Sequence, residues 1–228
     1  MNMNNPFVKK GVAGQWIRFI TNRDIIGTLN QQYVEKILKN WLQNTRDFSL
    51  IDIGCGNGNF LDFDAVNRFK SYTGVDESSY LIQYAKENYE NDKTTFFNSS
   101  VYDLPFKDES FDFLISMNVW YYLKNIYLAA EECSRVLKKD SHFIILTADP
   151  KKYEDFFSNR GKIMKKTKKS LTLEGKIENY RETVHLGRVE HKLWSMDEIL
   201  TSFISSGFKI KKIDRCKNNR IIIFGQKE

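Results

Sequence analysis

Three glycines stand at every second position directly after an apolar run that contains one carboxylate. The stretch is LIDIGCGNGNF, residues 50–60, with glycines at 54, 56 and 58 and with Asp52 inside the apolar run. A strand that leads through a glycine-rich turn into a helix brings bare backbone amides next to a ligand at the carboxyl end of a parallel sheet. A tight turn without a ligand is the alternative, but the alternating glycines favour a backbone that a ligand approaches closely.

The residues around the glycines narrow the kind of ligand. The dinucleotide fingerprint G-x-G-x-x-G would need its third glycine at position 59, which is Asn59, and no P-loop Lys-Ser/Thr pair follows. Asp52 would repel a pyrophosphate and attract an ammonium group. Asp76 ends the next predicted strand, where its carboxylate can accept hydrogen bonds from both hydroxyls of a ribose; a helix cap is the alternative role. A ligand with a ribose at one end and an amino acid at the other is S-adenosylmethionine.

Strands and helices must alternate if these residues are to meet at one edge of a sheet, and the sequence has this pattern. Strands rich in Ile, Val and Phe, separated by helices, predict βαβ units and a parallel sheet covered on both faces. The predicted strands are 49–54, 71–76, 94–100, 111–117, 141–149, 208–214 and 220–227, and the predicted helices include 29–42, 78–91 and 126–139. Ser78 or Ser79 is the expected N-cap of one helix, and a capping box of Ser195 and Glu198 begins a further helix that ends at Gly207.

We expect a single α/β domain over residues 1–228, because this length can bury a sizeable core and no linker divides it. Within it, residues 1–45 are expected to form N-terminal helices, 46–150 the cofactor-binding core, 151–194 a substrate lid, and 195–228 a closing helix and strand pair. The segment 151–194 has turn signals and period-two stretches but no long helical pattern. We therefore interpret it as an insertion before the last helix.

Four stretches together carry a resemblance to a known family. They are Asp52-x-Gly54-x-Gly56-x-Gly58, Asp76 after YTGV, SSVYDLPFKDESFDFLISMNV and AAEECSRVLKKDSHFIIL. In order and spacing they resemble the class I S-adenosylmethionine-dependent methyltransferases, above all those that act on small molecules, over residues 48–147. The resemblance implies a Rossmann-like, doubly wound, mainly parallel seven-stranded sheet with an antiparallel last strand. It also implies S-adenosylmethionine as cofactor, S-adenosylhomocysteine as product, and a small-molecule acceptor with an oxygen, nitrogen or sulfur nucleophile.

The resemblance assigns cofactor-binding roles to positions at the carboxyl ends of the strands. These positions are Asp52, Gly54, Cys55, Gly56, Asp76, Glu77, Leu81, Ser100, Val101 and Met117. Residues 54–56 would lie under the methionine part, and Asp76 would hold the ribose. Glu77 and Leu81 would flank the ribose and adenine, and the carbonyl of Met117 would accept from the ligand's amino group.

One position departs from the family's pattern. Related sequences often carry an aspartate before the LPF stretch that accepts a hydrogen bond from the adenine amino group, and here this residue is Ser100. Its hydroxyl could accept the same bond more weakly, while the amide of Val101 would donate to the ring.

Candidates for contact with the acceptor come from two segments. Trp120 and Tyr121 directly follow the fourth strand and could wall an acceptor pocket, with ordinary helix packing as an equal alternative. His191 is the candidate general base, because a hairpin with its turn at 186–189 places it on the apolar face of that hairpin. His191 would point into the cleft if the hairpin is a lid. The alternative is a buried core histidine whose hydrogen bonds are satisfied within the protein.

Missing motifs disfavour several classes of function. The Asp/Asn-Pro-Pro-aromatic tetrad typical of DNA and RNA amino-methyltransferases does not follow the fourth strand, which disfavours a nucleic-acid substrate. Cys133 falls inside a predicted helix, which disfavours a base methylase with a catalytic cysteine. The three cysteines, at 55, 133 and 216, form no CxxC, so neither a disulfide nor a metal site is expected.

The location and the partners are predicted from coarser features. The formal net charge of +6 permits an anionic partner without requiring one. No apolar run reaches the ~18 residues of a membrane helix, and the start MNMNNPFVKK has no apolar signal segment, so we expect a cytoplasmic protein without a membrane partner. The oligomeric state is open. Two other functions also stay open: a nonenzymatic cofactor-binding partner subunit, and a nicotinamide-dependent dehydrogenase, which Asn59 and Asp52 disfavour.

Overall fold

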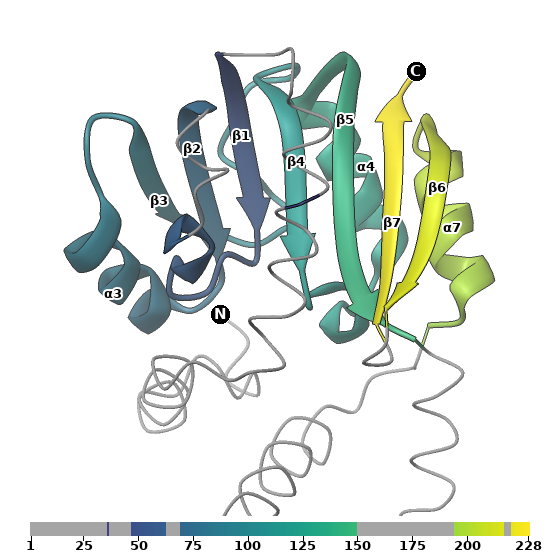
Figure 1. Cartoon of the computed structure of the whole chain (residues 1–228), viewed down its shortest axis with the longest axis horizontal. Coiled ribbons are helices and arrows are strands. Elements are labelled where there is room, and N and C mark those ends of the chain that lie inside the picture. Colours follow the sequence, from purple (N-terminus) through teal and green to yellow (C-terminus); the bar gives the residue numbers. More distant parts are fainter. Residues whose placement is uncertain (1–35, 37–46, 63–68, 150–193, 217–219) are drawn as a thin grey trace, which may run out of the picture.

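A seven-stranded sheet forms the centre of the molecule (Figure 1). The computed structural model describes residues 36, 47–62, 69–149, 194–216 and 220–228. The strands are β1 (Phe48–Ile53), β2 (Phe69–Asp76), β3 (Thr94–Asn98), β4 (Phe111–Met117), β5 (Leu137–Ala148), β6 (Phe208–Cys216) and β7 (Arg220–Lys227). Their spatial order is β3-β2-β1-β4-β5-β7-β6, with β1 to β5 parallel to one another and β7 antiparallel to both β5 and β6. The order reverses direction at β1, so the predicted doubly wound sheet with an antiparallel last strand is confirmed.

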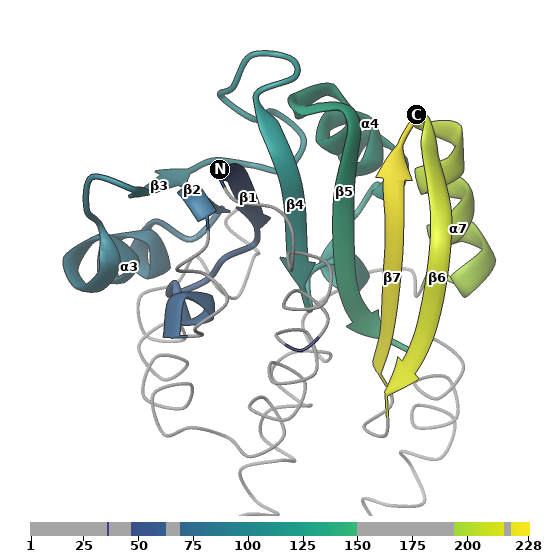
Figure 2. The ribbon, with the colours of Figure 1, turned by 45° about the horizontal axis from the view of Figure 1, so that its top comes forward.

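Among the described residues, three α-helices pack on the two faces of this sheet, α3 (Ser79–Tyr89) on one and α4 (Ile126–Val136) and α7 (Met196–Ser205) on the other (Figure 2). Two short 3-10 helices, η1 (Asn59–Asp62) and η3 (Trp120–Tyr122), follow β1 and β4. The expected N-terminal helices (1–45) and lid (151–194) lie outside the described residues, apart from Lys36 and Trp194. No helix in the described part of the chain is long and apolar enough to cross a membrane.

The predicted helix starts agree with the structure because each cap is encoded within four residues. The Ser78 side chain accepts a hydrogen bond from the Leu81 amide at 3.3 Å, which makes Ser78 the N-cap of α3. The Ser195 hydroxyl accepts from the Glu198 amide while the Glu198 carboxylate accepts from the Ser195 amide, so the predicted capping box is present at α7.

The boundary between α4 and β5 differs from the prediction. The sequence predicts a helix up to residue 139, but α4 ends at Val136, and Leu137 is already extended and paired with Phe111. Asp140 has a φ of 61°, and the register shifts between Phe111 and Phe113. Leu137 is therefore the first residue of β5 to pair with β4, and the regular pairing resumes at His142. The sequence does not reveal this boundary, because the lysines after Leu137 fit a helical pattern equally well.

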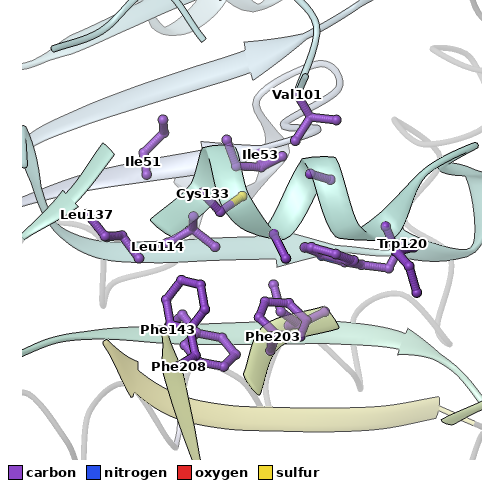
Figure 3. Close-up of a cluster of buried hydrophobic side chains, with 14 of the residues drawn as sticks. Ile51, Ile53, Val101, Leu114, Trp120, Cys133, Leu137, Phe143, Phe203 and Phe208 are labelled. Atoms are coloured by element: carbon purple, nitrogen blue, oxygen red, sulfur yellow. The ribbon is translucent and has the colours of Figure 1, made fainter. Parts of the chain in front are cut away.

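Both faces of the sheet bury apolar side chains, which explains why the strands read as nearly continuous apolar runs. Leu50 and Ile51 are neighbours in β1, yet they belong to different clusters, one on each face. On the face of α4 and α7, Phe143 of β5 stacks on Phe203 of α7 with ring centroids 4.7 Å apart (Figure 3). The positions around β1, β2 and β4 are therefore held from both sides.

Candidate cofactor site

The glycine turn folds back onto the end of β2. The backbone N–H groups of Gly54 and Cys55 both donate to the carbonyl of Val75, at 2.7 Å and 3.0 Å. Gly54, Gly56 and Gly58 have φ angles of 73°, 58° and 80°. An L side chain is strained in this left-handed region, so the alternating glycines are explained first by the backbone path of the turn.

The three glycines differ in what lies beside them. A Cβ added at Gly54 would come 2.2 Å from a methyl carbon of Val119, and one at Gly58 would come 3.1 Å from the ring of Tyr89. A Cβ at Gly56 would meet nothing within 4 Å. Gly54 and Gly58 therefore allow the protein to pack closely on itself, whereas Gly56 leaves bare backbone beside open space where a ligand can lie.

Asp76 is tied to this turn and to the start of α3. One oxygen of its carboxylate accepts from the N–H of Gly56 at 3.0 Å, and the other accepts from the N–H of Ser78 at 2.8 Å. Burial raises the pKa of Asp76 to about 6, against the lowering effect of these two bonds. The group is therefore ionised at neutral pH, and each oxygen still has a lone pair for a further donor. Asp76 can therefore cap the start of α3 through Ser78 and also bind a ligand, because each oxygen of its fixed carboxylate can accept a second hydrogen bond.

Asp52 lies beneath the turn and is only 2% exposed. The hydroxyl of Tyr72 donates to its carboxylate at 2.6 Å. Burial raises the pKa of Asp52 to about 7, the bond from Tyr72 opposes that rise, and the charge of Asp76 adds to it. The sequence analysis gave no role to Tyr72. The signal that could have indicated one is a tyrosine on the strand that neighbours the strand of Asp52.

Cys55 and Cys133, the cysteines whose side chains the structure describes, have no nucleophilic character. Cys55 is buried within the turn, and its sulfur lies where a side chain at Gly74 would have to be. Burial raises the pKa of both the Cys55 thiol and the Cys133 thiol. Both groups are therefore neutral thiols. No cluster of potential metal ligands occurs among the described residues.

The predicted adenine side of the site begins where β3 ends. The Ser99 amide donates to the Asp76 carbonyl at 3.2 Å, which joins this loop to the end of β2. The Ser100 hydroxyl donates to the Glu77 carboxylate at 2.9 Å. Val101 and Leu81 are both buried, the latter in the first turn of α3. The structure thus brings these four predicted residues to the same edge as Asp76, with Ser100 already engaged by Glu77.

Arg135 of α4 holds the loop that follows. Its guanidinium donates to the carbonyls of Leu104 and Phe106 at 3.0 Å and 2.7 Å. It also pairs with Glu132 at 2.7 Å and with Asp108 at 2.8 Å. The LPF stretch after Val101 is therefore fixed by a helix on one face of the sheet.

The chain reverses sharply after Met117, at the end of β4. Asn118 has a φ of 62°, and its N–H donates to the carbonyl of Leu146 at 2.7 Å. The turn directs Val119 onto Gly54, so the loop after β4 touches the glycine turn directly. The sequence missed both Asn118 and Val119; the signal at Asn118 is that asparagine tolerates the left-handed conformation.

The candidate acceptor residues have different surroundings. Trp120 is fully buried, and its ring lies 4.5 Å from that of Phe203, so it fills the core, as in the packing alternative (Figure 3). Tyr121 is partly exposed, and the guanidinium of Arg220 lies 6.0 Å from the centre of its ring. His191 lies outside the described residues.

Comparison with known proteins identifies this arrangement. Residues 51–145 match a family model described as a methyltransferase domain. Residues 51–145 therefore correspond to a methyltransferase domain. The matched range runs from β1 to β5 and includes all of the cofactor-binding residues predicted from the sequence. A nicotinamide-dependent dehydrogenase is disfavoured by this match as well as by the glycine spacing.

Individual relatives share this domain at low identity. The chain is 26% identical over 103 residues to a fatty-acid O-methyltransferase of Mycolicibacterium smegmatis, covering 45% of this chain and 38% of that protein. It is 28% identical over 108 residues to the O-methyltransferase rstn1 of Aspergillus nomiae, covering 46% of this chain and 48% of that protein. The match therefore spans less than half of these relatives. The solved structure of the PH0226 protein from Pyrococcus horikoshii has the same fold, with a TM-score of 0.68, 18% identity, and coverage of 90% of this chain and 93% of that one.

The cofactor of this class is S-adenosylmethionine, and the methyltransferase domain fits it at three points. Open space adjoins the backbone at Gly56, the Asp76 carboxylate is fixed beside that space, and Asp52 is a buried carboxyl group whose ionised form a ligand ammonium would favour. The bound cofactor supplies an electrophilic methyl group on a sulfonium. Asp76 would hold the ribose hydroxyls, and residues 54–56 would support the methionine part.

Proposed function

We propose that this protein transfers a methyl group from S-adenosylmethionine to a small-molecule acceptor. The observation that carries the proposal is the glycine turn with Asp76 bonded to it, at the point where the strand order reverses. Methyl transfer from a sulfonium is an in-line displacement, so holding the two reactants in line can supply much of the rate acceleration. A base is needed only when the acceptor carries a proton.

The loop after β4 supports the choice of a small acceptor. Enzymes that methylate extruded bases stack the base on an aromatic side chain in this region. Of the aromatic residues that follow β4, Trp120 is fully buried against Phe203, while Tyr121 is partly exposed. Val119, just before it, packs on Gly54. Trp120 and Val119 therefore cannot receive a base, and the segment after β4 also lacks the Asp/Asn-Pro-Pro-aromatic tetrad, which favours a metabolite over a nucleic acid.

A labelling experiment tests the acceptor class. The protein is incubated with S-adenosylmethionine labelled in its methyl group and with a cell extract separated into metabolite and macromolecule fractions. We expect label in the metabolite fraction. Label found only in protein or RNA would contradict the small-molecule assignment, and cofactor binding without transfer to either fraction would favour the nonenzymatic partner subunit.

Asp76→Ala should weaken the binding of S-adenosylhomocysteine by about 1–3 kcal/mol, because charge-assisted bonds to the ribose are lost. The turn also loses the bonds from Gly56 and Ser78 that fix it. Titration calorimetry measures the change. Asp103→Ala is the matched control, since Asp103 is an exposed carboxylate on the nearby loop, and it should keep wild-type affinity. Equal affinities for the two variants would remove Asp76 from the ribose site.

His191 stays the proposed general base. His191→Ala should lower turnover much more than it lowers affinity for S-adenosylhomocysteine, with a smaller loss at high pH, where the acceptor ionises without help. Steady-state kinetics with an acceptor found in the labelling experiment would measure this. His185→Ala is the control from the same predicted hairpin, and wild-type turnover in the His191 variant would exclude His191 from the mechanism.

A further inference from the structure

Tyr72 and Asp52 form a buried, hydrogen-bonded pair under the glycine turn. Binding of the cofactor does not by itself require such a pair. In the parallel pairing of β1 with β2, Leu50 lies opposite Tyr72 and Asp52 lies opposite Gly74. Both polar side chains are thus on the same face of the sheet. Tyr72 is 2% exposed and packs edge-on against Phe96 at 5.9 Å, so its ring has little freedom. Its hydroxyl is aimed along the sheet and donates to Asp52 at 2.6 Å.

The surroundings of Asp52 offer its charge little other support. Among the described residues, the Tyr72 hydroxyl is the only hydrogen-bond donor to this carboxylate. In the described part of the chain, the other titratable groups that act on Asp52 or face it are Asp76, at the end of β2, and Cys55 in the turn, and neither is positive. On β4, the residue opposite Asp52 is the apolar Ile115. A buried carboxylate in this setting is costly to ionise unless a cation comes near it.

We propose that Tyr72 is a positioning residue for the cofactor: its hydroxyl favours the ionised form of the Asp52 carboxyl beneath the glycine turn, so that a ligand carrying an ammonium group binds more tightly at neutral pH. The inference rests on the proposed function, because the ligand concerned is S-adenosylmethionine or its product. It adds a residue that contacts no reactant and acts only through Asp52.

The direction of the pH effect follows from the charges. Burial raises the pKa of Asp52 from 3.8 to about 7, so the stability that this group contributes to the ligand-free chain is present below pH 3.8 and is lost as the pH rises through about 7. A ligand ammonium favours the ionised form. Affinity should therefore increase as the pH rises through the same range. Without the Tyr72 hydroxyl the pKa of Asp52 rises further, and the midpoint of the affinity curve should move to higher pH.

The test is the affinity for S-adenosylhomocysteine, measured by calorimetry from about pH 5.5 to about pH 9. Tyr72→Phe removes only the hydroxyl. At pH values below the midpoint of the affinity curve, the variant should bind about tenfold more weakly for each pH unit by which that midpoint rises. At the highest pH its affinity should approach that of wild type. Asp76 also titrates in this range and its charge acts on Asp52, but its own hydrogen bonds, with Gly56 and Ser78, are the same in both proteins.

Two controls separate positioning from general damage. Tyr89→Phe removes a phenol that donates to Asp62 at 3.2 Å, a second tyrosine–aspartate pair, and should leave the curve in place. 5′-Methylthioadenosine, which has no ammonium group, should bind wild type and Tyr72→Phe equally at every pH.

A loss of affinity that is uniform over pH, or an unmoved midpoint, would overturn the proposal. Asp52→Asn gives an independent check if Tyr72→Phe does not fold, because it should remove the part of the pH dependence centred near 7; an unchanged curve in that variant would also overturn it. A wild-type chain that binds neither ligand would overturn the cofactor assignment itself and this inference with it. Normal wild-type binding with an unmoved midpoint would refute the role of Tyr72 alone.

Discussion

Gly54→Ala should abolish most binding of S-adenosylhomocysteine. The new Cβ would lie 2.2 Å from a methyl carbon of Val119, and the residue would have to keep a φ of 73°. The left-handed conformation costs about 1–2 kcal/mol for an L residue, and overpacking typically costs about 1–3 kcal/mol. The turn can escape this strain only by moving away from Val119 and changing its backbone path, so we expect affinity to fall by about a hundredfold or more. Calorimetry with the ligand measures the loss.

Gly207→Ala is the matched control for the glycine turn. Gly207 follows α7 with a φ of 84°, and a Cβ there would meet nothing within 4 Å. It carries the same backbone strain without the clash and without proximity to the turn, so affinity should be unchanged. Adding Val119→Ala to Gly54→Ala should restore part of the binding. If Gly54→Ala binds as tightly as wild type, the contact between the turn and the β4 loop has no bearing on the site.

Phe203→Ala should reduce the free energy of unfolding by about 3–5 kcal/mol, the usual cost of deleting a fully buried phenylalanine. Phe203 is 0% exposed and joins three aromatic neighbours, with ring centroids 4.5 Å from Trp120, 4.7 Å from Phe143 and 5.6 Å from Phe208 (Figure 3). The three remaining rings belong to η3, β5 and β6, so no single segment can move to fill the cavity. Denaturant unfolding followed by circular dichroism measures the loss.

The neighbouring residue provides the control for this stability test. Ile204 is 59% exposed on the same helix, and Ile204→Ala should change the free energy of unfolding by less than about 0.5 kcal/mol. A loss below about 1 kcal/mol for Phe203→Ala would mean that α7 does not pack on the sheet as described.

The features that sequence reasoning predicted are encoded over short distances. The glycine turn, the N-cap at Ser78 and the capping box at Ser195 each depend on residues that are within four positions of one another. The βα alternation predicted the parallel strands, and the family resemblance supplied the antiparallel β7. Asp76 was identified because it ends a strand whose place beside β1 follows from the fold.

The features that were missed depend on contacts between segments that are far apart in sequence. The bond from Tyr72 to Asp52 requires the register of two strands, and the contact of Val119 with Gly54 requires the path of the loop after β4. Trp120 could be read as a pocket wall or as core, because only the position of α7 decides which environment surrounds its ring. The early end of α4 depends likewise on the pairing of Leu137 with Phe111.

The central claim is that the glycine turn, Asp52 and Asp76 together hold S-adenosylmethionine. Its most direct test is titration calorimetry of the purified chain with S-adenosylhomocysteine and, separately, with NAD, at a pH of about 8, where the pKa of about 7 leaves Asp52 ionised. We predict saturable binding of S-adenosylhomocysteine, weakened by Asp76→Ala, and no binding of NAD at the same concentrations. Tighter binding of NAD than of S-adenosylhomocysteine would contradict the account.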